Sequence, residues 1–173
     1  ILSEPEPHAP FAFARAIWHY GRGVAYAAME NEDAALNELA AIERLEPEVD
    51  EIFMGNVYPA KNLLAIAKSL LRGEIAFRSG AMAAAVVSFE EAVAMQDALP
   101  YTEPPFWYYP TRQSLGAALL AEGRAAEAQL VFEADLEQYP MNGWSLYGLT
   151  EALSTQGHTA LAEAARLRFE AVW

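Results

Sequence analysis

Apolar and polar positions alternate along the chain with the three- and four-residue spacing of amphipathic helices, most clearly in residues 112–140. Gly123 falls where a left-handed residue would end a first helix, and Pro140 falls where a second helix must stop. This segment therefore predicts a helix, a turn and a second helix. The apolar residues spaced to fill the core between the two helices are Leu115, Leu119, Val131 and Leu136.

The same pattern returns elsewhere in the chain, which indicates an internal repeat. Gly157 follows Gly123 by 34 residues, and small residues such as Gly116 and Ala128 stand where two helices would cross closely. One such helix pair cannot bury its own apolar face, so neighbouring pairs must stack. The residues that share the spacing are Leu115, Gly116, Gly123, Ala128, Phe132 and Pro140, then Leu149, Gly157, Ala162 and Arg166, and upstream Gly73, Gly80, Ala85, Phe89, Ala92, Gly23, Tyr26, Ala35, Leu39 and Pro47.

These residues resemble the tetratricopeptide repeat family over nearly the whole chain. The resemblance implies an all-α fold, a right-handed α-solenoid of antiparallel helix pairs with insertions between units. Residues 1–15 are expected to be an N-terminal extension or the start of the first helix, and residues 16–173 the repeat array. The four expected units are residues 16–47, 66–99, 109–142 and 143–170.

Two insertions separate the expected units, in EPEVDEIFMGNVYP and in DALPYTEPPFWYYP. Residues 60–79 predict one long helix, and Pro105 and Pro110 both fit near the start of the helix that runs to Glu122. The stretch EPPFWYYPTRQSLGAALL, followed by NGWSLYGL, also resembles the C-terminal part of longer bacterial tetratricopeptide proteins of uncharacterised function. That closer resemblance indicates a family and no particular activity.

Composition and charge exclude several classes of function. The net charge is −13, with 24 acidic and 11 basic residues, so the chain lacks the basic surface with which proteins neutralise nucleic-acid phosphates. No uncharged stretch approaches the roughly 18 residues that span a bilayer, so no membrane insertion is expected. Cysteine is absent, which excludes disulfides and thiolate metal sites. The first residues do not form a signal peptide, and we interpret the chain as a fragment or a processed product whose compartment is unknown.

The sequence contains none of the residue spacings that common catalytic sites require. His8, His19 and His158 have no second histidine at helical spacing, no serine lies in a nucleophile elbow, and no phosphate-binding glycine loop is present. We therefore expect no enzymatic activity, no metal and no cofactor. His19 is expected to pack or to form a hydrogen bond, and His158 to face solvent at the start of a helix.

The most unusual segment is the aromatic-proline run at residues 100–110, which includes Trp107 and Tyr108. Its aromatic side chains have two interpretations. They fill the wider gap that an insertion leaves between repeat units, or they form an exposed ledge that holds a peptide. The structural interpretation is favoured, because aromatic residues this dense are usually at least half buried.

In the tetratricopeptide family the first helix of each unit lines the concave face, and this implies a set of partner-binding residues. A mixed aromatic and acidic lining suits a peptide of basic or apolar character. Equally, four units could form too shallow a groove, with these residues facing a neighbouring segment. With the aromatic-proline run included, the expected partner-binding residues are Tyr20, Leu70, Glu74, Phe77, Trp107, Tyr108, Gln113, Tyr147 and Glu151.

The leading functional hypothesis is a non-catalytic scaffold that binds a protein or peptide. A second hypothesis is a stacking module of a longer repeat chain or a homo-oligomer, and a third is an accessory domain of a larger enzyme. Apolar residues at both ends of the array, among them Trp18 and Trp173, bear on the second hypothesis, because terminal repeats normally carry a polar cap. Their apolar character allows self-association through the ends.

Overall fold

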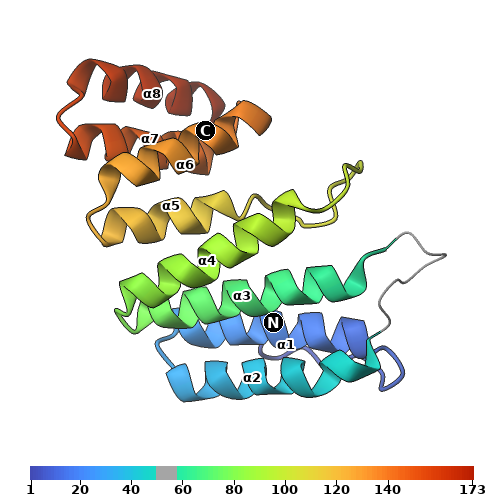
Figure 1. Ribbon diagram of the computed structural model, residues 1–173. Coiled ribbons are helices and arrows are strands. Elements are labelled where there is room, and N and C mark those ends of the chain that lie inside the picture. The colour runs from blue at the N-terminus through green and yellow to red at the C-terminus, as the bar shows by residue number, and fades with distance from the viewer. Residues whose placement is uncertain (50–57) are drawn as a thin grey trace. The chain divides into compact units, whose positions relative to one another are not determined.

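The computed structural model describes residues 1–49 and 58–173, and these residues are helical with no β-strand (Figure 1). The predicted all-α class is therefore confirmed. The first expected insertion includes residues 50–57, which lie outside the described residues. The α-helices are α1 (Ala12–Ala28), α2 (Glu32–Leu45), α3 (Ala60–Arg78), α4 (Met82–Asp97), α5 (Arg112–Ala121), α6 (Ala125–Gln138), α7 (Gly143–Thr155) and α8 (Thr159–Val172), with a short 3-10 helix η1 (Glu46–Glu48) after α2.

Three-residue turns join α1 to α2, α3 to α4, α5 to α6 and α7 to α8, and they share one backbone geometry. The middle residue of each turn has a positive φ, and the next N–H donates to a carbonyl five residues earlier, at 2.8 to 2.9 Å. This is the hydrogen-bond pattern with which a left-handed residue caps a helix. The expected caps at Gly123 and Gly157 are confirmed. The four left-handed residues are Glu30, Gly80, Gly123 and Gly157.

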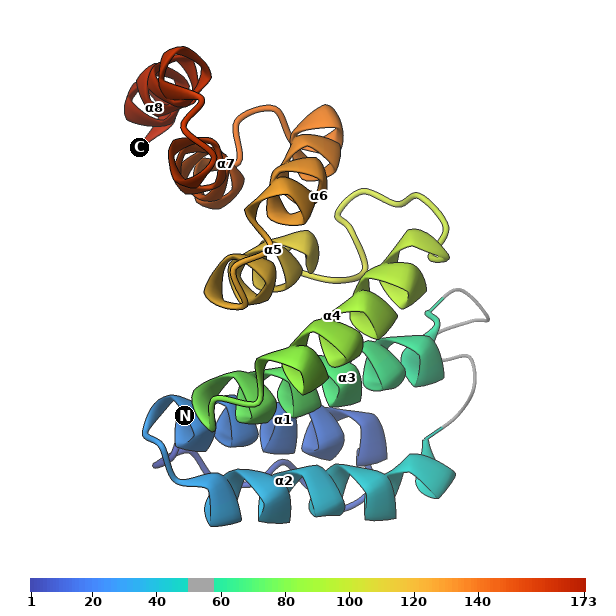
Figure 2. The same cartoon turned by 60° about the vertical axis from the view of Figure 1, so that its left-hand side comes forward.

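The chain forms two compact units, an N-terminal unit (Ile1–Tyr108) and a C-terminal unit (Tyr109–Trp173). In the N-terminal unit α1 packs against α2 and α3, and α3 packs against α4 (Figures 1 and 2). In the C-terminal unit α5 packs against α6, α7 packs against α6 and α8, and α5 also contacts α7. Each unit thus contains two helical hairpins whose first helices touch.

Close helix crossings depend on glycine opposite phenylalanine. A Cβ atom at Gly116 would lie 2.3 Å from Cζ of Phe132, and one at Gly148 would lie 2.2 Å from the same atom. The Phe132 ring therefore sits against glycine both in its own hairpin and in the next one. Gly73 approaches Phe89 in the same way in the N-terminal unit. The expectation of a small residue at a close helix crossing is confirmed at Gly116.

The connection between α4 and α5 packs on the N-terminal unit instead of extending α5. The ring centroids of Trp107 and Tyr20 lie 5.6 Å apart, as do those of Phe106 and Tyr58. The expectation that Pro105 lies near the start of a helix is wrong, because α5 begins at Arg112. The two aromatic contacts hold the preceding residues against the N-terminal unit and away from a helical path.

Replacing Gly116 with leucine is expected to destabilise the C-terminal unit, because the new side chain would overlap the buried ring of Phe132. We expect Gly116→Leu to lower the free energy of unfolding by about 1–3 kcal/mol. The matched control, Ala117→Leu, places the same side chain at the neighbouring exposed position and should change it by less than about 0.5 kcal/mol. Urea unfolding measures both, and equal midpoints for the two variants would contradict the described crossing.

Glu30 is the one non-glycine residue with positive φ among the described residues, at +58°. A side chain in this region is strained by about 1–2 kcal/mol. Glu30→Gly should therefore raise the free energy of unfolding by about 0.5–1 kcal/mol after the greater freedom of glycine in the unfolded chain is subtracted. Glu30→Ala keeps the strain but loses the carboxylate. If Glu30→Ala stabilised the protein as much as Glu30→Gly, the carboxylate and not the backbone would be the cause.

Candidate functional site

Two expected binding residues of the N-terminal unit belong to its core. Tyr20 and Leu70 are 5% and 2% exposed, so neither can meet a partner in this conformation. Tyr20 is covered because Trp107 packs on it, and Leu70 because α3 packs against three other helices. Phe77 and Glu74 remain half-buried. Glu74 also accepts a hydrogen bond from Arg78 Nε at 2.9 Å, which reduces its pull on a basic partner.

The aromatic-proline run divides into buried and exposed side chains. Trp107 is buried in the N-terminal unit, whereas Tyr108 and Tyr101 are exposed. Tyr108 lies against the Trp107 ring, with centroids 5.3 Å apart, and the Tyr101 hydroxyl donates to Glu103. The run therefore packs against its own unit while leaving two tyrosines on the surface.

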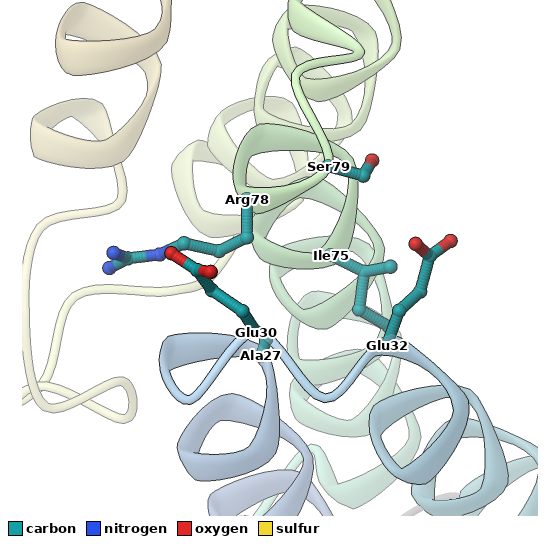
Figure 3. Close-up of a pocket in the computed structure, with 6 residues that line it drawn as sticks. All are labelled: Ala27, Glu30, Glu32, Ile75, Arg78 and Ser79. Atoms are coloured by element: carbon teal, nitrogen blue, oxygen red, sulfur yellow. The ribbon is translucent and has the colours of Figure 1, made fainter.

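A small pocket of about 140 Å³ opens beside the turn between α1 and α2 (Figure 3). Its polar side chains come from Glu30, Glu32, Arg78 and Ser79, with Ala27 and Ile75 as its apolar part. Figure 3 shows the Glu32 side chain on the other side of the opening from Glu30 and Arg78. Ligand sites for cofactors usually measure about 300–1,000 Å³. The pocket is therefore too small for a cofactor, and none of the expected binding residues lines it.

Three exposed aromatic residues of the C-terminal unit lie on α7 or directly after α8, next to the half-buried Phe169 of α8, and we call Trp144, Tyr147, Phe169 and Trp173 the α7–α8 aromatic cluster. The Trp144 and Trp173 ring centroids lie 5.2 Å apart, and those of Tyr147 and Phe169 lie 5.8 Å apart. Trp144, Tyr147 and Trp173 are 61%, 52% and 70% exposed. The sequence analysis selected Tyr147 but missed Trp144. Trp144, Tyr147 and Glu151 are spaced three and four residues apart, so helical periodicity alone could have placed all three on one face of the helix.

The remaining expected residues of the C-terminal unit also lie at its surface. Gln113 is half-buried on α5. Glu151 is exposed on the same face of α7 as Tyr147, one helical turn later. Helices α5 and α7 contact each other. The structure thus leaves Gln113, Tyr147 and Glu151 accessible on two neighbouring first helices.

A buried polar network fixes the start of α7 and hence the position of Trp144. Asp135 on α6 is almost fully buried and accepts hydrogen bonds from Ser145 Oγ at 2.5 Å and Asn142 Nδ2 at 2.7 Å. Asn142 in turn accepts a bond from the Trp144 N–H through Oδ1, capping the helix. Burial raises the pKa of Asp135 above its ordinary value, and the bonds from Ser145 and Asn142 oppose that shift. These hydrogen bonds therefore hold the start of α7, which carries Trp144, in one position relative to α6.

His19 takes part in hydrogen bonding between helices, whereas His158 lies at the surface. His19 Nδ1 lies 2.5 Å from Glu38 Oε2, and its Nε2 lies 3.9 Å from a carboxylate oxygen of Glu6, so both ring nitrogens face carboxylates. The predicted hydrogen-bonding role of His19 is confirmed. His158 is exposed and begins α8, as predicted. Across residues 1–49 and 58–173, no three histidine, aspartate or glutamate side chains gather as metal ligands would.

Comparison with known proteins returned no match to a family model, to a curated protein or to a solved structure. Within the described ranges, every helix is too short or too polar to cross a membrane.

Asp135 should make the stability of the protein depend on pH. Its folded-state pKa is raised, so its contribution is fully present below the ordinary value of 3.8 and is lost as pH rises through the raised pKa. We therefore expect the difference in unfolding free energy between wild type and Asp135→Asn to shrink or reverse between about pH 4 and pH 7. Urea unfolding of both proteins across this range measures it. A constant difference would mean that Asp135 titrates normally.

Proposed function

We propose that this chain is a non-catalytic scaffold, built on tetratricopeptide-like repeats, that binds a peptide or partner domain through the first helices of its C-terminal unit and the α7–α8 aromatic cluster. The observation that carries the proposal is the exposure of Trp144, Tyr147 and Trp173 together. Aromatic side chains dominate the energetics of protein interfaces, whereas monomers rarely expose several of them side by side.

The repeat architecture is proposed from the hairpins. All four described turns have the same capping pattern, and first helices touch within each unit. These are the features expected of stacked tetratricopeptide pairs, in which the first helices would line a concave face. Gln113, Tyr147 and Glu151 would then lie on that face, where rigid helices hold side chains in place without further ordering on binding.

The proposed partner is a peptide that combines basic and apolar residues. Glu151 would attract a lysine or arginine, and the net charge of −13 would raise the rate of encounter. The cluster would then supply the apolar contact and, for a cation over a tryptophan face, an additional attraction. Glu74 contributes less to this picture, since Arg78 already pairs with it.

Stacking of a further repeat on α8 is the second candidate, and the charges on α8 disfavour it. On α6, Gln129, Phe132 and Leu136 form one row, and its first two residues meet the next hairpin: Gln156, directly after α7, donates to Gln129 at 2.8 Å, and Phe132 lies against Gly148 of α7. The row 34 residues later is Glu163, Arg166 and Glu170, which form ion pairs on the exposed surface of α8. A helix stacked on α8 would meet the charged side chain of Arg166 where α7 meets the apolar ring of Phe132. Such a polar face is typical of the end of a repeat stack.

Selection from a displayed library of random peptides tests the proposal. Wild-type protein should enrich peptides that contain lysine or arginine beside apolar residues, with affinities that weaken as salt is added. For a selected peptide we expect Tyr147→Ala to weaken binding by about tenfold or more and Glu151→Lys by several-fold. Fluorescence anisotropy with a labelled peptide gives the dissociation constants.

The matched control is Leu130→Ala, which removes an exposed apolar side chain from α6 of the same unit and should leave the affinity unchanged. Equal losses in Leu130→Ala and Tyr147→Ala would point to nonspecific adhesion. If no peptide were enriched and the protein instead formed dimers that Trp173→Ala dissociates, as seen by sedimentation velocity, self-association would replace the proposal. Catalytic accessory roles require a partner enzyme, and nothing in the described residues favours one.

A further inference from the structure

The chain's first residues lie along the surface of α1, in the N-terminal unit, whereas the proposed peptide site lies in the C-terminal unit. Arg22 Nη1 donates to the carbonyl of Leu2 at 3.1 Å, and Arg15 Nε donates to a carboxylate oxygen of Glu6 at 2.6 Å. The Ile1 side chain also lies over Gly21. Because later residues of the segment meet earlier residues of α1, the segment runs opposite to the helix. We call residues 1–7 the N-terminal strap.

The surface under the strap is organised around Arg22. Its Nε donates to Glu38 at 2.8 Å and its Nη2 donates to the Tyr26 hydroxyl at 3.0 Å. The guanidinium carbon lies 4.5 Å from the centre of the Trp18 ring and 5.4 Å from that of Tyr26. The hydrogen bond with Glu38 raises the pKa of Arg22 further. The guanidinium is therefore fixed before anything binds, and the Nη1 that reaches Leu2 needs no ordering.

Glu38 holds the side chains of His19 and Arg22 in position. It is a buried carboxylate on α2, and it contacts both His19 and Arg22 of α1. A buried carboxylate with two partners is strongly held in place, because each partner offsets part of the cost of burying its charge. The α1 surface is thus a preformed site, braced from the neighbouring helix, and not a patch of loose surface arginines.

The strap carries an acidic side chain, Glu6, opposite basic side chains of the α1 surface. Arg15 and His19 both face the carboxylate of Glu6, and the hydrogen bond from Arg15 lowers the pKa of Glu6. Pro5 and Pro7 flank Glu6, and proline restricts both its own backbone and that of the residue before it to extended conformations. An extended segment with an acidic side chain between prolines therefore pairs with a basic, aromatic surface in a strongly acidic protein.

We infer that the α1 surface formed by Arg15, Trp18, His19 and Arg22 is a recognition site for an extended acidic peptide that contains proline, and that the N-terminal strap occupies this site as an intramolecular ligand. The inference goes beyond the proposed function, because it concerns the other unit and a peptide of opposite charge. Its failure would leave the proposal for the α7–α8 aromatic cluster untouched.

Exchange of the strap for a second peptide is energetically accessible. The pair between Arg15 and Glu6 is partly exposed, and such pairs contribute little individually. A tethered segment nevertheless competes at an effective concentration on the order of millimolar. A free peptide of the same sequence would consequently bind the intact chain weakly, and would bind more tightly once the strap's own contact is weakened.

The test adds a synthetic peptide of residues 1–10, capped at its N-terminal end and carrying a nitroxide spin label at its C-terminal end, to the full chain and follows the broadening of the four tryptophan indole N–H signals by NMR. The Trp18 signal is assigned from its loss in Trp18→Phe. We expect the labelled peptide to broaden the Trp18 signal saturably and to bind Glu6→Gln about twofold to fivefold more tightly than wild type. The matched control is Glu4→Gln, which removes an exposed acid from the same segment and should bind the peptide as wild type does.

Two further measurements complete the test. Arg15→Gln in the Glu6→Gln background should reduce peptide affinity again, and the peptide carrying Glu6→Gln should bind more weakly than the original. The inference is overturned if Glu6→Gln binds the peptide no better than Glu4→Gln does, or if no saturable binding occurs. It is equally overturned if the labelled peptide broadens the signals of Trp144 and Trp173 while that of Trp18 stays sharp.

Discussion

One left-handed residue in each three-residue turn holds the described helices in pairs. The capping hydrogen bonds turn the chain back at a fixed angle, so the second helix of each hairpin lies against the first. A hairpin formed this way still has an apolar face, which it can bury only against another hairpin. Glycines such as Gly116 and Gly148 let a ring fit between neighbouring helices, and stacking follows from that fit.

Packing within each unit also determines which aromatic residues stay exposed. Tyr20 and Trp107 cover each other and become part of a core, whereas Trp144 and Trp173 contact each other and still face solvent. The two pairs have similar ring separations, so the difference lies in what surrounds them. Asp135 and its hydrogen-bond partners hold the start of α7 rigidly beside the exposed pair. A rigid, exposed aromatic surface loses little entropy when a partner binds.

Charge is distributed unevenly over an acidic protein. The net charge of −13 acts at long range, but at contact distance each surface presents its own groups. Around α1, Arg15 and Arg22 surround an acidic segment, while on α7 the exposed carboxylate of Glu151 stands beside an aromatic ring. The two units therefore present surfaces of opposite preference. Both surfaces are proposals for recognition, and each rests on side chains that helices hold in position.

The sequence by itself determined the helices and the glycine turns, because spacing and capping are local properties that a few consecutive residues decide. It did not determine the burial of Tyr20 and Leu70, nor the exposure of Trp144 beside Trp173, because helical spacing places a residue on a face without saying what covers that face. Only the tertiary structure brought Glu38 to Arg22, since this pair depends on the register between two packed helices. Local rules therefore predicted the helices and their turns, and packing decided which side chains are exposed.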